Sequence, residues 1–438
     1  DGGMVNDQRS TILGVARMVQ HYDNYSYPSK LVPHRNMEGD AVTESTLDTY
    51  RIQKFAIVNG AIYGVGIVGG GDNHTQVYVK TASTDLTSVW TTAPATSTSA
   101  SSVESNTMAL GYRNYIYGVN TGGVWKYGDV TGSPSFTYND YTTNVPTAPG
   151  LVHSKDDVMY IPSSNKIIKN IDTTGSGWSV ALTLPTNSTI RSICEYGNDL
   201  AIACDQVDGS CVIYLWDRDA SLSTLSEKID WGVGSLQLIE TIGGILCGIS
   251  TTTSLGNITS ATKLTFKYWS GSRPITFQEF DCTASVTLTD KQKFNDLFYF
   301  LGETTIAGTA IRALWRIYKK ADGQMTVSVD RLPRGDTALS SGSLKGFYRA
   351  GDYVFISYLI PTTNAYTIWR SNDQATYSST TSFWESSIFN QGDSSLTKKL
   401  IGVSLTFESL QATATAKLSY RVDGATSWTE IFTASTDG

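Results

Sequence analysis

The chain has 438 residues, of which 40% are hydrophobic and 11% aromatic, so it can bury a large core and does not have the composition of a disordered protein. A net charge of −7 argues against a scaffold that holds nucleic acid through phosphate contacts, and no apolar run approaches the length of a membrane-spanning helix. We therefore expect two or three globular domains or one repeat array, with no specific nucleic-acid partner and no membrane span.

Residues 1–53 do not fit the pattern of the rest of the chain. Pro28 and Pro33 restrict the backbone around residues 27–35 to extended conformations. We expect an extended N-terminal arm that lies over the surface or between subunits. The arm could also supply a strand that closes a ring.

Within residues 54–390, a pair of turn residues followed by an apolar strand recurs seven times. Pairs such as Asn59-Gly60 and Gly243-Gly244 tolerate the positive φ that tight hairpins require. The strands after the turns are centred 42 to 56 residues apart, at Ile62, Ile116, Met159, Ala201, Leu246, Phe298 and Val354. Such a period is typical of β-propellers.

Each repeat has room for four antiparallel strands. Third strands with aromatic and charged residues are expected at 76–80, 124–127, 166–169, 212–216, 264–269, 314–318 and 366–370. More polar fourth strands are expected at 88–90, 135–138, 177–179, 275–277, 327–329 and 382–384. We predict an all-β, seven-bladed β-propeller of four-stranded antiparallel blades; a solenoid or tandem sandwiches are the alternatives.

Residues 391–438 form a second end that does not fit the repeat. We expect a strand at 399–408 and a hairpin of residues 416–422 and 428–432 around Asp423-Gly424. Three strands are marginal alone, so this C-terminal β-sheet segment needs a partner. The partner would be further chain that completes a larger β-sandwich, which the end at residue 438 favours, or a neighbouring subunit.

The five cysteines and four histidines form no metal-binding pattern. The cysteines (Cys194, Cys204, Cys211, Cys247 and Cys282) form no CxxC pair, and most lie in apolar runs. We expect buried free thiols; a Cys204–Cys211 bridge is the alternative. The histidines (His21, His34, His74 and His153) are scattered, and no metal or cofactor is expected.

Catalytic motifs are absent or better explained by structure. Residues 64–69 (GVGIVG) match GxGxxG, but a strand pattern rather than a helix follows, so we expect a glycine-rich blade loop. No residue is selected for a Ser-His-Asp site. Aspartates at the repeat turns (Asp156, Asp157, Asp199, Asp296 and Asp352) are explained by turn chemistry. We predict no catalytic, cofactor-binding or metal-binding residues and no enzymatic activity.

Two recurring patterns point to blade packing. Residues 83–90, 371–377 and 172–178 are similar to degenerate Asp-boxes of sialidase-type propellers, whose role in that family is structural. Tryptophans recur on the third strands, where interblade packing is the first explanation and a sugar platform the second. They are Trp125, Trp216, Trp269, Trp315 and Trp369.

The whole layout resembles β-propeller virion proteins of tailed bacteriophages. The resemblance rests on the arm with residues 30–33 (KLVP), the Ser/Thr/Gly/Tyr-rich propeller and the strand pair around residues 420–424 (YRVDG) and Ser427-Trp428. It implies a structural tail component (hub, nozzle or fibre-attachment protein), located in the virion as an extracellular particle. Its partners would be other virion proteins and copies of itself, with a host surface glycan as a further candidate.

The rival hypothesis is a secreted propeller that binds or cleaves glycans, as sialidases do. It predicts an axial pocket with paired carboxylates and exposed aromatic side chains.

Overall fold

The computed structural model describes most of the central part of the chain and shorter pieces of both ends. The described residues are 16–20, 22–23, 32–33, 37–40, 50–68, 74–80, 90–93, 108–120, 123–221, 225–253, 262–306, 309–320, 323–331, 342–360, 365–372, 383–386, 415–420 and 427–435.

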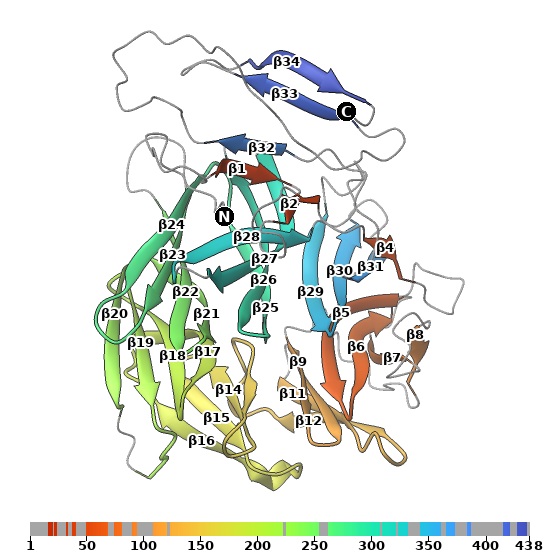
Figure 1. Cartoon of the computed structure of the whole chain (residues 1–438). Coiled ribbons are helices and arrows are strands. Elements are labelled where there is room, and N and C mark those ends of the chain that lie inside the picture. Colours follow the sequence, from red (N-terminus) through yellow and green to blue (C-terminus); the bar gives the residue numbers. More distant parts are fainter. Residues whose placement is uncertain are drawn as a thin grey trace.

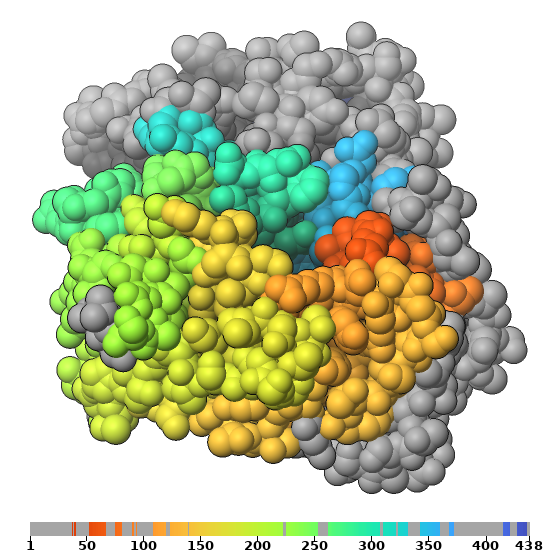
Figure 2. Space-filling model, turned by 90° about the horizontal axis from the view of Figure 1, so that it is seen from below, coloured from red at the N-terminus to blue at the C-terminus, as the bar shows by residue number. Residues whose placement is uncertain are grey.

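The protein is an all-β propeller. Apart from the short 3-10 turn η1 (Gly175–Gly177), the regular elements of the described residues are strands. The sheets follow one another around a common axis (Figure 1), and the space-filling view shows successive parts of the chain arranged as a ring (Figure 2). Within the described part of the chain, no helix is long and apolar enough to cross a bilayer.

Five of the sheets have four strands each. The first sheet comprises β5 (Tyr50–Val58), β6 (Ala61–Val68), β7 (His74–Lys80) and β8 (Trp90–Thr92). The second comprises β9 (Met108–Tyr112), β10 (Tyr115–Asn120), β11 (Gly123–Gly128) and β12 (Ser135–Tyr141). The third comprises β13 (Leu151–His153), β14 (Val158–Ser163), β15 (Lys166–Asn170) and β16 (Trp178–Thr183). The fourth comprises β17 (Ser188–Tyr196), β18 (Asp199–Gln206), β19 (Ser210–Trp216) and β20 (Glu227–Val233). The fifth, called here the closing sheet, comprises β29 (Ser343–Ala350), β30 (Tyr353–Ile360), β31 (Ala365–Asn372) and β4 (Glu38–Gly39).

The predicted count of seven four-stranded sheets is wrong, because the remaining strands form one eight-stranded sheet. Its first half is β21 (Ser235–Ile242), β22 (Ile245–Thr253), β23 (Thr262–Trp269) and β24 (Ile275–Cys282). Its second half is β25 (Thr287–Phe294), β26 (Leu297–Ile306), β27 (Thr309–Lys319) and β28 (Met325–Arg331). The halves join where Cys282 pairs with Ile306, at the far end of the ten-residue strand β26.

All seven predicted hairpins are confirmed. In each, the first and second strands pair antiparallel across a tight turn. Six turns contain the predicted pair, whereas the fourth is formed by Gly197-Asn198, one residue before the predicted Asn198-Asp199, because Asp199 already pairs with Tyr196. Both residues of the pair adopt the expected left-handed conformation at three turns: Asn59 (φ 51°) with Gly60 (φ 77°), Gly243 (φ 51°) with Gly244 (φ 79°), and Asn295 (φ 49°) with Asp296 (φ 55°). Each of the other four turns has one left-handed residue: Arg113, Asp157, Gly197 or Gly351. Local turn chemistry therefore sets the repeat.

The N-terminal arm closes the ring, as one of its predicted alternatives required. Strand β4 pairs with β31 as the fourth strand of the closing sheet. Of residues 382–384, predicted to fill that position, Phe383 and Trp384 lie in β32 (Phe383–Ser386), which pairs instead with β1 (Ala16–Gln20), and residue 382 lies outside the described residues. A second pair within the arm joins β2 (Tyr22–Asp23) to β3 (Val32–Pro33).

At the other end of the chain, the predicted C-terminal hairpin is confirmed. Strand β33 (Ala416–Tyr420) pairs antiparallel with β34 (Thr429–Ala434). The predicted strand at residues 399–408 lies outside the described residues.

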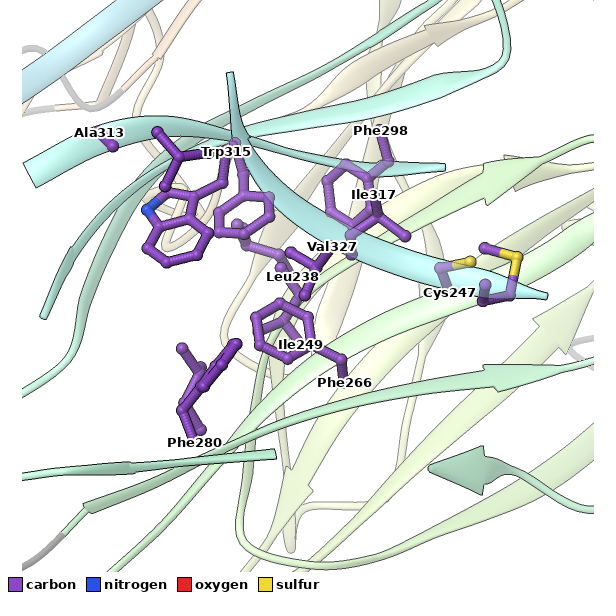
Figure 3. Close-up of a cluster of buried hydrophobic side chains, with 14 of the residues drawn as sticks. Leu238, Cys247, Ile249, Phe266, Phe280, Phe298, Ala313, Trp315, Ile317 and Val327 are labelled. Carbon is purple, nitrogen blue, oxygen red and sulfur yellow. The ribbon is translucent and has the colours of Figure 1, made fainter. Parts of the chain in front are cut away.

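The core is a series of apolar clusters between neighbouring sheets. The cluster in Figure 3 joins the two halves of the eight-stranded sheet, where Phe266 lies 6.1 Å from Phe300 and Phe280 lies 6.3 Å from Trp315 between ring centroids. The glycine-rich motif at 64–69 is not a loop as predicted, because residues 64–68 belong to β6. Gly64 is required there by the side chain of Ile52, which would lie 2.7 Å from an added Cβ.

Candidate functional site

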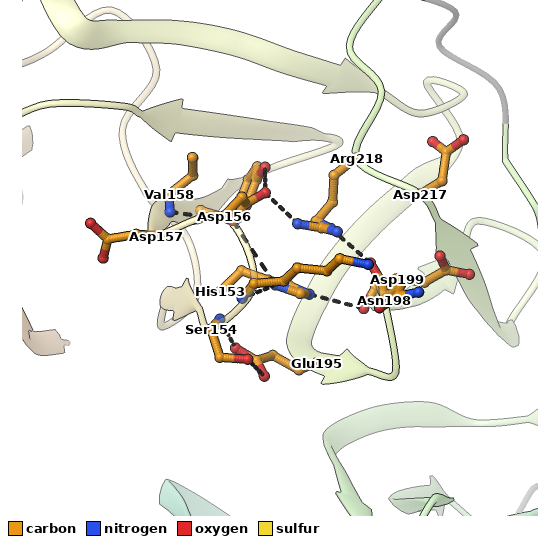
Figure 4. A network of polar contacts seen from close by, with 12 residues as sticks. His153, Ser154, Asp156, Asp157, Val158, Glu195, Asn198, Asp199, Asp217 and Arg218 are labelled. Carbon is orange, nitrogen blue, oxygen red and sulfur yellow. Dashed lines mark hydrogen bonds and ion pairs between the residues drawn. The ribbon is translucent and has the colours of Figure 1, made fainter.

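A network of polar contacts lies where the third and fourth sheets meet (Figure 4). It is built from the turn between β13 and β14, the turn between β17 and β18, and the segment after β19. Because it combines a serine, a histidine and several acids, it is the first place to look for chemistry.

The geometry around His153 does not form a nucleophile–base pair. The ring is fully buried; its Nδ1 accepts a hydrogen bond from Lys155 N (3.3 Å), and Nε2 faces the carbonyl oxygen of Asp199 (3.3 Å). This pairing places the proton on Nε2 and leaves neither nitrogen facing a hydroxyl. Ser154 Oγ donates instead to Glu195 Oε2 (2.8 Å), and Ser154 N donates to the other oxygen of that carboxylate.

The carboxylate of Asp156 is also engaged by neighbouring side chains. Its Oδ2 accepts from Tyr160 OH (3.0 Å) and forms a short contact with Arg218 NH1, while Arg218 Nε donates to Asn198 O (2.9 Å). Burial, and then the charge of Asp156, raise the pKa of Tyr160. The network therefore bonds the third sheet to the fourth rather than presenting a reactive group.

Similar bridges link three other pairs of neighbouring sheets, at or near their turns. Asn59 Nδ2 donates to Asn114 Oδ1 (3.1 Å), from the first sheet to the second. Arg113 Nε donates to Asp157 Oδ2 (3.2 Å), from the second to the third. Thr241 Oγ1 donates to the carbonyl oxygen of Glu195 (2.6 Å), from the eight-stranded sheet to the fourth. The polar turn residues thus recur as bonds between consecutive sheets.

The predicted turn aspartates are not gathered into one acid pair. Asp156 and Asp157 belong to the third sheet and Asp199 to the fourth, while Asp296 and Asp352 lie on turns of the second half of the eight-stranded sheet and of the closing sheet. Asp296 and Asp352 are exposed, and Asp157 and Asp296 adopt positive φ (52° and 55°). Turn chemistry explains the backbone conformation of these two, whereas sequence alone did not reveal the bridges that Asp156 makes to Arg218 and that Asp157 makes to Arg113.

Two lysines form hydrogen bonds between the innermost strands of different sheets, near the axis of the ring. The sequence did not reveal these bonds. Lys291 Nζ, from β25, donates to Ile193 O (2.7 Å) and Ile239 O (2.6 Å) and lies 3.1 Å from Glu240 Oε2. One side chain from the second half of the eight-stranded sheet therefore bonds both β17 and β21. Lys54 Nζ in turn donates to Thr289 O (2.8 Å), which links β5 to β25 across the closing sheet.

Buried base–acid pairs recur between third and fourth strands. Lys126 Nζ lies 2.9 Å from Asp140 Oδ1, and Arg316 NH1 lies 2.6 Å from Asp330 Oδ1. The sequence showed the bases on the third strands but not their partners. Trp178 Nε1 of the following sheet also donates to Asp140 (2.8 Å), and burial, followed by the charge of Asp140, raises the pKa of Tyr117.

The packing interpretation of the third-strand tryptophans is confirmed for four of them. Trp125, Trp216, Trp269 and Trp315 are at most 3% exposed, and Trp369 packs against a core cluster. Of the Asp-box-like segments, residues 172–178 are described: Asp172 caps a turn by accepting from Thr174 N (2.7 Å), and Trp178 is buried. Most of residues 83–90 and 371–377 lies outside the described residues.

The cysteines are buried free thiols, as expected, and no Cys204–Cys211 bridge forms. A search of the described residues finds no group of three or more His, Cys, Asp or Glu side chains placed to hold a metal ion.

No protein-family model and no curated protein matches the chain. A chain in the mitotic checkpoint complex is 12% identical, with a TM-score of 0.47 over 78% of this chain and 95% of that chain. The Cps50 (Swd1) β-propeller domain of Myceliophteria thermophila is 10% identical, with a TM-score of 0.44 over 77% of this chain and 99% of that one. Trypanosoma rangeli sialidase is 13% identical, with a TM-score of 0.36 over 60% of this chain and 54% of its own. All three TM-scores lie below 0.5, so function is argued from the residues themselves.

Proposed function

We propose that this chain is a structural component of a bacteriophage tail, a rigid, non-catalytic propeller that serves as a hub, nozzle or fibre-attachment platform. The layout of arm, propeller and C-terminal strand pair supports the phage assignment. The observation that carries the structural role is the use of polar turn residues as bonds between consecutive sheets, because groups consumed in such bonds are not available for chemistry.

We further propose that the eight-stranded sheet acts as two blades, which gives the ring seven. Residues of both halves contribute to one buried cluster, with Phe266 facing Phe300 and Phe280 facing Trp315. Packing of this kind is expected between neighbouring blades and not between strands that lie side by side in one sheet. The pair of Cys282 with Ile306 would then be an edge contact between blades.

The axial lysines favour partners that bind outside the centre of the propeller. Lys291 and Lys54 bond innermost strands across two intervals of the ring each, which narrows and stiffens its centre. A subunit that lines a conduit for DNA would be assembled from several copies around a wider axis, and its own centre would stay bridged. Partners would therefore bind the faces or rim of the propeller.

Cryo-electron microscopy of intact virions from the phage that encodes the chain tests this proposal. We expect density for the propeller at a repeated position in the tail, with contacts above about 1,000 Å² to neighbouring subunits. Particles that lack the chain in both their density and their peptide mass spectrum would overturn the proposal.

Glycan binding remains the second candidate because of one feature of the C-terminal hairpin. Tyr420 (45% exposed) and Trp428 (40% exposed) are the exposed aromatic side chains of the described residues. Aromatic rings with a wet polar edge are common at recognition surfaces. Binding of the full chain to a glycan array, lost in Trp428→Ala and retained in Ile275→Ala (41% exposed, on the propeller), would support this function.

A further inference from the structure

The ring has one seam, at which the chain does not run on from the third strand of a sheet to its fourth strand. In the closing sheet, β31 ends at Asn372, whereas the fourth strand, β4, comes from the arm and leads into β5 of the first sheet, which begins at Tyr50. An apolar cluster spans the seam, with Phe55 and Phe355 on either side of Trp90 at ring-centroid distances of 5.8 and 6.1 Å. Ser357 Oγ also donates to the carbonyl oxygen of Ile52.

A four-residue segment of the arm, Met37 to Asp40, lies on this seam. Met37 is 1% exposed and belongs to the core cluster between the eight-stranded and closing sheets. Glu38 and Gly39 pair with β31, and Asp40 N donates to Ile368 O (2.8 Å). The segment is therefore held at both ends by buried side chains and in the middle by strand pairing.

Asp40 bonds to both sides of the seam at once. Its Oδ1 lies 3.1 Å from Arg370 NH1 of the closing sheet. Its Oδ2 lies 2.8 Å from Lys80 Nζ and accepts from Trp90 Nε1 (2.8 Å), both of the first sheet. The side chains of Asp40 and Lys80 are 1% and 0% exposed, so this is a fully desolvated charge pair.

The same arrangement occurs inside the ring at Asp140. There too a base of the third strand (Lys126), an acid of the fourth strand and a tryptophan that begins the fourth strand of the following sheet (Trp178) bond to one another. Asp40 follows β4, the fourth strand of the closing sheet, and Trp90 begins β8, the fourth strand of the next sheet. The arm thus supplies the repeat-equivalent acid from more than 300 residues away.

We propose that Met37–Asp40 is a latch and that the ring opens and closes at this one seam. At Asp140 the covalent chain keeps neighbouring sheets together when the acid is lost. At Asp40 the chain does not run from β31 to β4 and on to β5. The buried Asp40–Lys80 pair and the pairing of β4 with β31 therefore oppose separation of the closing sheet from the first sheet. Loss of the acid should therefore open the seam locally, before the rest of the ring unfolds.

Amide hydrogen exchange of the full-length Asp40→Ala and Asp140→Ala variants tests the latch, since the two changes remove matched acids. For Asp40→Ala we expect exchange in β5, β29 and β31 to rise at least about tenfold over the unaltered protein, with β17–β20 unchanged. For Asp140→Ala we expect faster exchange in β11, β12 and β16, with β5, β29 and β31 within about twofold. Asp40→Asn, which keeps an acceptor for Trp90 Nε1 but not the charge, should show the pattern of Asp40→Ala in weaker form.

The proposal is overturned if Asp40→Ala leaves exchange in β5 and β29 unchanged, or if it accelerates exchange evenly around the ring. Should Asp40→Ala fail to fold, Asp40→Asn decides by the same criterion. Gly39→Ala serves as a folding control within the latch, because an added Cβ there meets no atom within 4 Å, and it should leave the exchange pattern as it is.

Discussion

Replacing Lys291 by methionine should lower the free energy of unfolding by about 3 kcal/mol. The ammonium group makes three contacts of 2.6 to 3.1 Å, to two carbonyl oxygens and to Glu240, and the side chains of the ion pair are 14% and 13% exposed. Removing one partner of a buried pair costs about 3–5 kcal/mol, and the residual exposure places this pair at the lower end. Methionine keeps much of the volume, so cavity formation adds little.

Unfolding in urea, followed by tryptophan fluorescence, measures this loss. Lys293→Met is the matched control, because Lys293 lies on the same strand but pairs with Asp296 at 3.6 Å with both side chains exposed (43% and 69%). Its loss should stay below about 0.5 kcal/mol. In the double variant with Glu240→Gln, the loss should be smaller than the sum of the two single losses. A loss for Lys291→Met no greater than that for Lys293→Met would refute the axial bridge.

Three further results are expected. Gly111→Ala should lower the free energy of unfolding by about 2–3 kcal/mol, because the added Cβ would lie 1.9 Å from Ile57 O. The control is Gly132→Ala, whose Cβ meets no atom within 4 Å and which should leave the free energy of unfolding unchanged in the same urea titration. Burial raises the pKa of Glu303 above 4.5, so the folded state binds this proton more tightly than the unfolded state, and the free energy of unfolding falls as the pH rises from 4.5 through the raised pKa. Glu303→Gln, whose amide oxygen can still accept from Leu344 N, should therefore raise the free energy of unfolding more at pH 7 than at pH 4. An equal change in the free energy of unfolding at both pH values would contradict this. Burial also raises the pKa of all five thiols, to about 12 for Cys194 and Cys211, so a disulfide reagent at pH 8 should label none of them until urea unfolds the chain.

Hairpins were predictable because their signals are local. A pair such as Gly243-Gly244 accepts two consecutive left-handed residues, and the apolar strands on either side need no distant partner to be recognised. The period of these turns then predicts a propeller. The count of separate sheets was not predictable, because it depends on how far β26 extends and on whether Cys282 reaches Ile306 at its end.

The strand pairing that closes the ring, in contrast to the hairpins, has no local signal in the sequence. Strand β4 has two residues, and its pairing with β31 joins positions more than 300 residues apart. No local pattern distinguishes Glu38-Gly39 from other polar residues of the arm, while residues 382–384 have the aromatic character of an outer strand. The interpretation that sequence favoured for that position was therefore wrong, and the role of Asp40 is revealed by its partners Arg370, Lys80 and Trp90, which lie far from it in the sequence.

For the buried base–acid pairs, the sequence predicts the bases on the third strands but not the acids that pair with them. Lys126 lies opposite Thr137 in the strand register, and its acid stands three residues further along, at Asp140, beyond a bulge. Arg316 lies opposite Ser328 and pairs with Asp330, two residues on. Such diagonal pairs depend on register and bulges, which the residue pattern of a single strand does not contain.

The turn aspartates separate two roles that one residue type can play. Asp296 adopts positive φ at an exposed turn, which is the chemistry that its sequence context predicts. Asp156 occupies a similar position in sequence, yet its carboxylate is shared between Tyr160 and Arg218 of the neighbouring sheet. A catalytic acid in this position would have to give up both partners before it could exchange a proton with a substrate, and the third and fourth sheets would lose a bond between them. Its arrangement is that of a joint between sheets.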